Sequence, residues 1–217
     1  MHRKKSIVIL ALTLLLTACQ ETAFTADTLP WVGEEPVLFK DDFSDSLGGW
    51  MTHSDSLSYA GYEQSGFRLW VGVPNYQLWS VPGLNFMDTL IYARTLKLDG
   101  PDDNMYGVLC RYQDEENYYA LVIGSDGYYG IFKTVAGERV LIDQEHMDYS
   151  DAIHRGNENN EIQAICKGNQ LGLFVNGTKL LQVQDDSLSH GDVGLIVSNF
   201  SEAGVDILFD DFIVVKP

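Results

Sequence analysis

Hydrophobic and polar residues alternate with a period of two through most of the chain after residue 36. This alternation is typical of β-strands that bury one face, whereas an amphipathic helix repeats its apolar residues every three to four positions. No segment shows a long repeat of the helical kind. Strands are predicted at residues 37–43, 66–73, 75–80, 90–98, 107–113, 117–125, 128–135, 139–143, 161–166, 170–175, 179–184, 191–198 and 205–215.

Turn-forming residues separate these segments, as in a sandwich or barrel built from short strands. Asn176 and Gly177 are the strongest hairpin signal, because both residue types readily adopt the positive φ angles of a two-residue turn. The polar residues 144–160 are the one stretch in which a short helix or a long loop would fit. We therefore predict one all-β domain over residues 37–217, folded as an antiparallel sandwich or barrel.

The beginning of the chain has the features of a secretory signal. Residues 2–5 are basic and residues 6–16 are predominantly apolar, a run that is too short to span a bilayer comfortably. The four residues from Leu16 to Cys19, Leu-Thr-Ala-Cys, resemble the lipobox of bacterial lipoproteins.

The lipobox resemblance implies where the protein is found. Residues 1–18 would be a signal peptide, and Cys19 would carry the acyl chains that anchor the protein to a membrane. Residues 19–36 would be a flexible tether that holds the domain outside the cytoplasm. The alternative is an ordinary signal peptide that is followed by an unrelated cysteine.

The charge of the chain restricts its partners. The sequence has 31 acidic and 14 basic residues, which gives a formal net charge of −17. Loss of residues 1–18 would remove three Lys and Arg residues and no acidic one, and would leave 11 Lys and Arg residues against 31 acidic ones. Such a surface repels the phosphates of nucleic acids, so we expect no nucleic-acid partner. Membrane contact is expected through the lipid alone.

Cys110 and Cys166 each lie in the middle of a predicted strand. In an exported protein they could form a disulfide between neighbouring strands. Two buried thiols are the alternative, because cysteine packs well as a small hydrophobic residue. A metal site with two cysteine ligands would need clustered His or Cys partners, which the sequence does not provide.

Several framework motifs resemble those of concanavalin A-like (laminin-G-like) jelly-roll domains. They include residues 39–45 (Phe-Lys-Asp-Asp-Phe-Ser-Asp), 106–114 (Tyr-Gly-Val-Leu-Cys-Arg-Tyr-Gln-Asp), 173–177 (Leu-Phe-Val-Asn-Gly) and 209–212 (Phe-Asp-Asp-Phe). The nearest subgroup looks like the 3-keto-disaccharide hydrolase-like and glucanase-like sandwiches of secreted bacterial proteins. The resemblance covers about residues 37–215 and implies a jelly-roll β-sandwich. It implies little about activity, because one fold hosts many functions.

A sugar-binding surface needs aromatic rings for the apolar face of the sugar and polar groups for its hydroxyls. Both kinds of residue occur on the predicted strands. The candidate ligand-binding residues are Tyr76, Trp79, Arg111, Tyr119, Tyr129 and Lys133.

Strand alternation suggests how two of these candidates are placed. Arg111 shares a strand face with Leu109, and we expect that face to meet solvent or an acidic partner, because a buried unpaired arginine is costly. Tyr119 is expected near Arg111 on the concave sheet. The alternative is that the aromatic residues fill the core and that Arg111 neutralises a neighbouring carboxylate.

The glucanases that share this resemblance place carboxylates as Glu-x-Asp-x-Glu or Glu-x-Asp-x-x-Glu along one strand, for nucleophilic and acid–base roles. No such string occurs in this chain. A non-catalytic carbohydrate-binding domain is therefore the favoured function. The alternatives are a glycan-processing hydrolase of the 3-keto-disaccharide type and a structural or interaction lipoprotein without a small ligand.

Two pairs of acidic residues, Asp41 with Asp42 and Asp210 with Asp211, lie in matching motifs at the two ends of the domain. Terminal strands of sandwiches commonly pair, which would bring these carboxylates together. Ca²⁺ prefers such oxygen ligands and tolerates irregular geometry, so the four residues are candidates for a structural calcium site. The alternative is that they are solvated acidic strand ends.

Overall fold

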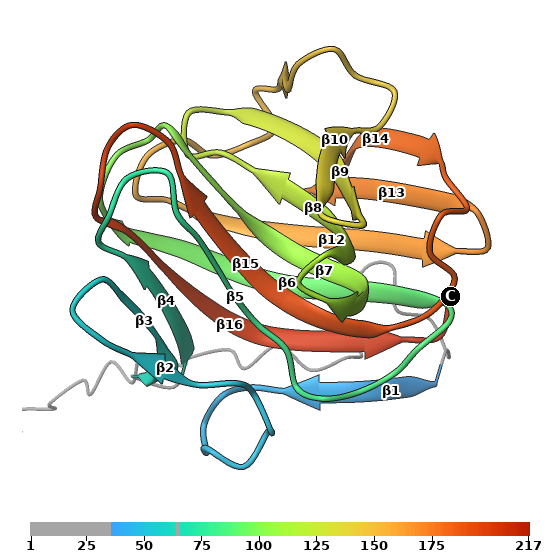
Figure 1. The fold of residues 1–217 in the computed structure, drawn as a ribbon, viewed down its shortest axis with the longest axis horizontal. Coiled ribbons are helices and arrows are strands. Elements are labelled where there is room, and N and C mark those ends of the chain that lie inside the picture. Colours follow the sequence, from blue (N-terminus) through green and yellow to red (C-terminus); the bar gives the residue numbers. More distant parts are fainter. Residues whose placement is uncertain (1–35, 64–65) are drawn as a thin grey trace, which may run out of the picture.

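Two antiparallel β-sheets packed face to face make up the domain (Figure 1). The computed structural model describes residues 36–63 and 66–217, and these contain no helix. Accordingly, no helix with the length and apolarity of a membrane span is found within those ranges. The predicted all-β jelly-roll sandwich is confirmed. The predicted signal peptide, Cys19 and the tether up to residue 35 lie outside the described residues.

One sheet has nine strands in the described part of the chain, in the order β14-β13-β12-β6-β16-β4-β3-β2, with β1 beside β16. The first and last strands are thus neighbours, and Asp41 of β1 pairs with Phe212 of β16. The strands are β1 (Val37–Asp41), β2 (His53–Ser54), β3 (Ser58–Glu63), β4 (Gly66–Val71), β6 (Thr89–Asp99), β12 (Asn159–Lys167), β13 (Gln170–Val175), β14 (Thr178–Gln184) and β16 (Val205–Val215).

The other sheet has seven strands over the same described ranges, in the order β10-β9-β8-β7-β15-β5, with β11 beside β9. Its centre is the antiparallel meander of β7, β8 and β9, three strands whose positions the sequence predicts. The strands are β5 (Gln77–Ser80), β7 (Asn104–Asp114), β8 (Asn117–Ile123), β9 (Tyr128–Val135), β10 (Glu138–Leu141), β11 (Asp148–Tyr149) and β15 (Asp192–Asn199).

The inner faces of the two sheets enclose one hydrophobic core. Phe67 and Phe209 fill it from the nine-stranded sheet, and Tyr106 fills it from the seven-stranded sheet; all three are fully buried. Cys110 of β7 and Cys166 of β12 form a disulfide across this core. The predicted disulfide is confirmed, but it joins facing strands of the two sheets and not neighbouring strands of one sheet.

Alternation does not predict β2, β3 or β11, because their apolar signal is weak. The inward positions of β3 begin with Ser58 and Ala60, two small residues. Residues 144–160 form a loop that contains β11 and the start of β12, so the helix considered for this stretch is absent. β11 pairs with the first residues of β9 and extends the sheet.

Replacement of Cys110 and Cys166 by alanine in one double variant should lower the free energy of unfolding by about 3–4 kcal/mol. The disulfide joins residues that are 56 positions apart, so its loss releases a long loop in the unfolded chain. Urea denaturation of the variant, and of the wild-type protein with a thiol reductant, measures the change. An unchanged midpoint in the double variant would contradict the expected role of the cross-link.

Candidate functional site

The outer face of the seven-stranded sheet is concave. Gln77 lies on the edge strand β5 and Arg139 on the opposite edge strand β10, with four strands between them. At the usual spacing of about 4.8 Å between strands, a flat sheet would separate these edges by roughly 24 Å. Instead, Arg139 Nη1 donates a hydrogen bond of 2.7 Å to Gln77 Oε1. The sheet therefore curves until side chains from its two edges meet across the outer face.

Four ring-bearing side chains, which we call the aromatic face, line this concavity: Trp79 on β5, Tyr112 on β7, Tyr118 on β8 and Phe132 on β9. The rings of Tyr112 and Tyr118 stack with their centres 5.9 Å apart. Trp79 Nε1 donates a hydrogen bond of 3.0 Å to the Tyr112 hydroxyl. These contacts fix the orientation of the rings before any ligand arrives, which lowers the entropy lost on binding.

A hollow of about 460 Å³ opens beside the aromatic face at the β5 edge. Rings form part of its wall, and amide, imidazole and carboxyl groups reach it from neighbouring strands and loops. It is lined by Met51, Thr52, His53, Tyr76, Gln77, Leu78, Trp79, Tyr112 and Glu115. A concave surface with an apolar wall and a few polar groups is the usual form of a small-molecule site.

Arg139, Gln77 and Tyr118 form a chain of contacts over the aromatic face, which we call the polar clasp. Besides accepting from Arg139, Gln77 donates from Nε2 to the Tyr118 hydroxyl at 2.7 Å. The guanidinium carbon of Arg139 lies 4.2 Å from the centre of the Phe132 ring, within the range of a cation–π contact. Burial lowers the pKa of Arg139 below that of a free arginine.

Two of the six predicted ligand-binding residues, Tyr76 and Trp79, line the hollow. Tyr76 is 40% exposed and Trp79 is half-buried, so both offer surface to a ligand. Their role in binding stays a prediction. The other four candidates lie on the inner side of the sheet or at the edge of the core: Arg111, Tyr119, Tyr129 and Lys133.

Arg111 and Tyr119 are neighbours, as expected, but they lie inside the sandwich. Arg111 is 3% exposed and Tyr119 is fully buried. Both contact the backbone of Leu188: its N–H donates to the Tyr119 hydroxyl, and its carbonyl accepts from Arg111 Nη1. Neither side chain therefore reaches the concave face, and their expected position there is wrong.

A β-bulge explains this reversal. Arg111 has a φ angle of 52°, in the left-handed region, and the register between β7 and β8 shifts after Cys110. Leu109 faces outward, and simple alternation would place Arg111 on the same side. The bulge instead turns Arg111 inward and brings Tyr112 to the outer face beside Trp79.

The buried guanidinium of Arg111 finds hydrogen-bond acceptors on the backbone of three separate loops. Its guanidinium donates hydrogen bonds of 3.1, 2.7 and 2.8 Å to the carbonyls of Met87, Gly168 and Leu188. A carboxylate oxygen of Asp88 lies 3.4 Å from Nη2. The alternative considered from the sequence, that Arg111 has a carboxylate partner, thus agrees with the structure.

Tyr119, Lys133 and Asp185 form a polar cluster at the edge of the core. The Tyr119 hydroxyl donates a hydrogen bond of 2.6 Å to Asp185, and Lys133 pairs with the other carboxylate oxygen. Burial raises the pKa of Tyr119 to about 12. Burial also opposes the ionisation of Asp185, but the hydrogen bonds from Lys133, Tyr119 and Ser187 outweigh it and hold the pKa below its usual value.

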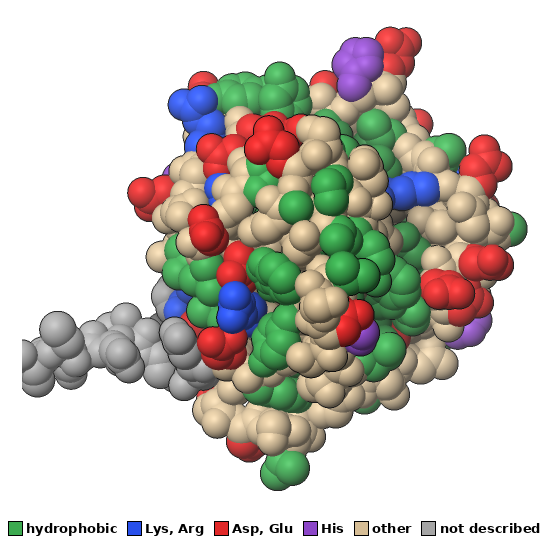
Figure 2. All heavy atoms as spheres, turned by 60° about the vertical axis from the view of Figure 1, so that its left-hand side comes forward, with side chains coloured by type: hydrophobic (Ala, Val, Ile, Leu, Met, Phe, Trp, Pro, Cys, Tyr) green, Lys and Arg blue, Asp and Glu red, His purple; other side chains and the backbone are tan. Residues whose placement is uncertain are grey.

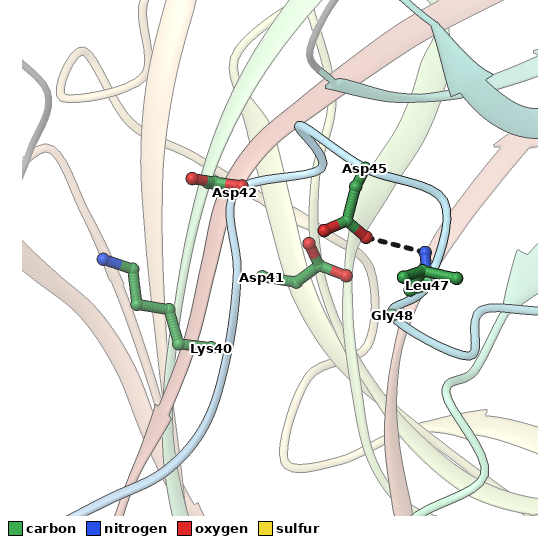
Figure 3. A pocket seen from close by; sticks show the side chains of 6 residues that line it. All are labelled: Lys40, Asp41, Asp42, Asp45, Leu47 and Gly48. Carbon is green, nitrogen blue, oxygen red and sulfur yellow. Dashed lines mark hydrogen bonds between the residues drawn. The ribbon is translucent and has the colours of Figure 1, made fainter.

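Asp41 and Asp42, two of the four acidic residues proposed for calcium, line a second hollow of about 420 Å³ at the end of β1. Figure 3 shows Asp41 and Asp45 pointing toward one another, while Asp42 points to the other side of the strand. Pairing of β1 with β16 places the two terminal acidic motifs on adjacent strands, as the sequence predicts.

These carboxylates already have partners within the protein. Asp41 accepts hydrogen bonds of 2.9 and 2.8 Å from Trp50 Nε1 and the Phe43 backbone N–H. Arg94 pairs with Asp210 and Asp211 at 3.2 and 3.0 Å. Across residues 36–63 and 66–217, no group of three or more His, Cys, Asp or Glu side chains could hold a metal ion. Calcium at this position stays a prediction.

The sequence did not single out most of the concave face, namely Gln77, Tyr112, Tyr118, Phe132 and Arg139. One local signal was available. Tyr118 alternates with Ala120 and Val122, whereas Tyr119 alternates with Leu121 and Ile123, and the larger aliphatic side chains fill the core. The strand face with the smaller residues is the one that large rings cover.

Asp185→Asn should lower the free energy of unfolding by about 1–3 kcal/mol near pH 7, because Lys133 and Tyr119 lose a charged acceptor. The folded-state pKa lies below the unfolded value of about 3.9, so this contribution is complete above about pH 5 and is lost as the pH falls toward the folded-state pKa. Urea denaturation from pH 7 to pH 3 should show the gap to wild type shrinking below about pH 4.

The exposed neighbour Asp186 provides the control, and Asp186→Asn should leave the free energy of unfolding nearly unchanged. A gap between wild type and Asp185→Asn that stays constant down to pH 3 would show that the ionised form of Asp185 is not what stabilises the cluster.

Comparison with known proteins shows a likeness of fold. No family model and no curated protein sequence matches this chain. The carbohydrate-binding module CBM66 from Bacillus subtilis has a TM-score of 0.64 and 15% identity, over 77% of this chain and 96% of the module. A β-glucanase from Bacillus licheniformis has a TM-score of 0.58 and 10% identity, over 82% and 98% of the two chains. The GH43 protein BlXynB from Bacillus licheniformis has a TM-score of 0.60 and 14% identity, over 82% and 39%. The domain thus shares the jelly-roll sandwich fold of these proteins.

Proposed function

We propose that this protein is an extracytoplasmic lipoprotein whose concave face binds carbohydrate without transforming it. The observation that carries the proposal is the hollow at the β5 edge, where Trp79 and Tyr112 of the aromatic face form part of the wall. Rings cover the apolar C–H face of a sugar, and the amide of Gln77 and the carboxylate of Glu115 can pair with its hydroxyls. A carbohydrate-binding module and a glucanase have similar folds, which supports a glycan as ligand by analogy only.

The lining of the hollow favours binding over hydrolysis. Most glycosidases use two carboxyl groups on opposite sides of the bond that breaks. Among the residues that line the hollow, Glu115 is the one carboxylate. His53 also lines it, but its Nε2 lies 3.2 Å from Asp55, which occupies one side of the ring. The hydrolase alternative would need a second acid that this hollow does not present.

Trp79→Ala should weaken glycan binding by at least about 10-fold, which corresponds to about 1.4 kcal/mol. The substitution removes the ring surface of Trp79 and the partner of the Tyr112 hydroxyl. A glycan array probed with the full-length protein in detergent identifies the ligand, and isothermal titration calorimetry on the best array ligand measures the loss.

Trp70→Ala is the matched control, because this half-buried tryptophan lies on β4, in the other sheet. It should bind as the wild type does. Equal binding by the Trp79→Ala variant and the wild-type protein would place the ligand elsewhere, and release of sugar products in a parallel hydrolysis screen would favour the hydrolase.

The lipid anchor is the second part of the proposal and rests on the lipobox at residues 16–19. In a bacterial host that is fed radiolabelled palmitate, the wild-type protein should carry the label and sediment with membranes. Cys19→Ala should carry no label and leave the membrane fraction, because no thiol remains to accept the lipid. A labelled or membrane-bound variant would contradict acylation at Cys19.

A further inference from the structure

Three of the four buried or half-buried arginines that the structure describes are paired with carboxylates, and the fourth lies on the concave face. Arg68 donates from Nε and Nη2 to the two oxygens of Asp206, at 2.8 and 2.7 Å. Arg94 and Arg111 also lie within 3.4 Å of a carboxylate oxygen. Among the buried and half-buried arginines that the structure describes, Arg139 alone is paired with an amide and a ring in place of an acid.

Arg139 also has an unused hydrogen-bonding edge. Its Nη1 donates to Gln77, but Nε and Nη2 are buried and have no hydrogen-bond partner among residues 36–63 and 66–217. These two nitrogens form the same edge of the guanidinium that Arg68 presents to the carboxylate of Asp206. The edge carries two parallel N–H donors, whose geometry matches the two oxygens of one carboxylate.

We infer that the carbohydrate bound by this protein carries a carboxylate, as in a uronic acid residue, and that Nε and Nη2 of Arg139 bind it. The inference rests on the proposed function and adds the chemical class of the ligand. Buried donors without partners are costly, and a charged donor more than a neutral one. A carboxylate satisfies both nitrogens at once, whereas a sugar hydroxyl satisfies one.

The contact requires a small movement within the polar clasp. Both nitrogens are covered in the structure, so the guanidinium has to pivot before a carboxylate reaches them. One hydrogen bond to Gln77 and the contact with Phe132 hold it in place. A bidentate, charge-assisted pair is stronger than a single hydrogen bond to a neutral amide, so binding favours this rearrangement.

The charge of the whole protein sets a limit on the ligand. The formal net charge of −17 repels a densely charged polyanion. Salt at physiological concentration screens this repulsion beyond about 8 Å, while the contact with Arg139 acts at hydrogen-bond distance. The arrangement therefore suits a mostly neutral oligosaccharide that carries isolated uronic acid residues.

The test compares matched ligands on the full-length protein. Xylo-, gluco- and galacto-oligosaccharides are each prepared in four forms: neutral, with one glucuronic acid branch, with the same branch reduced to the alcohol, and with one sulfate. Isothermal titration calorimetry should show at least about 10-fold tighter binding of the glucuronic acid form of the preferred backbone than of its neutral and reduced forms.

Variants then locate the preference. Arg139→Gln and Arg139→Lys should bring the affinities for the glucuronic acid form and the neutral form to near equality. Glutamine removes the charge, and lysine removes the paired donors. Arg155→Gln removes the same charge from an exposed arginine and should keep the preference. Thermal unfolding of each variant checks that the fold is retained.

Each remaining result overturns the inference in a distinguishable way. Equal binding of the acidic and neutral forms refutes the carboxylate while the carbohydrate-binding function stands. Preference for the sulfated form identifies another anion, and a preference that survives in Arg139→Gln identifies another residue. Absence of binding to every form, with an empty glycan array, removes the proposed function and this inference together.

Discussion

The β-bulge at Arg111 determines which side chains the concave face presents. Side chains alternate between the faces of a strand, so one inserted residue reverses every side chain beyond it. Three backbone carbonyls hold the guanidinium inside, and Gly191 makes room for the bulged backbone: a Cβ at Gly191 would lie 2.5 Å from the carbonyl carbon of Arg111. Tyr112 consequently turns outward, where it connects Trp79 to Tyr118. Without this reversal, the aromatic face would be divided in two.

Two adjacent tyrosines of β8 point to opposite faces of the same sheet. Tyr118 and Tyr119 are both buried, so burial does not distinguish them. Their hydroxyl partners do: Tyr119 bonds to Asp185 at the edge of the core, and Tyr118 accepts from Gln77 on the concave face. A tyrosine can take either place, because its ring is apolar and its hydroxyl needs one polar neighbour. The hydrogen-bond partner of each hydroxyl therefore shows which face of the sheet the side chain is on.

Period-two alternation was sufficient to predict the all-β sandwich, most strands and the possibility of a disulfide. It also assigned Tyr118 and Tyr119 to opposite faces of one strand, but alternation alone does not say which of the two faces points into the core. The bulge had no local signal, since it depends on Gly191, far along the chain from Arg111. The contact of Arg139 with Gln77 depends on the curvature of a whole sheet, which no short window of sequence encodes. Prediction thus failed on the concave face, where the direction of each side chain depends on distant partners.

The placement of cations follows from the acidity of the chain. Arg68, Lys97 and Lys133 each pair with a carboxylate, so their charge is locally neutralised. Figure 2 shows carboxylates distributed over the visible surface among few basic groups. In such a field, a guanidinium that is left without an acid keeps its desolvation cost uncompensated. Arg139 retains this state because its ring contact and one amide bond hold it over the aromatic face. The concavity therefore combines apolar rings with the guanidinium of Arg139, which is not paired with a carboxylate. This combination distinguishes it from the acidic surface around it.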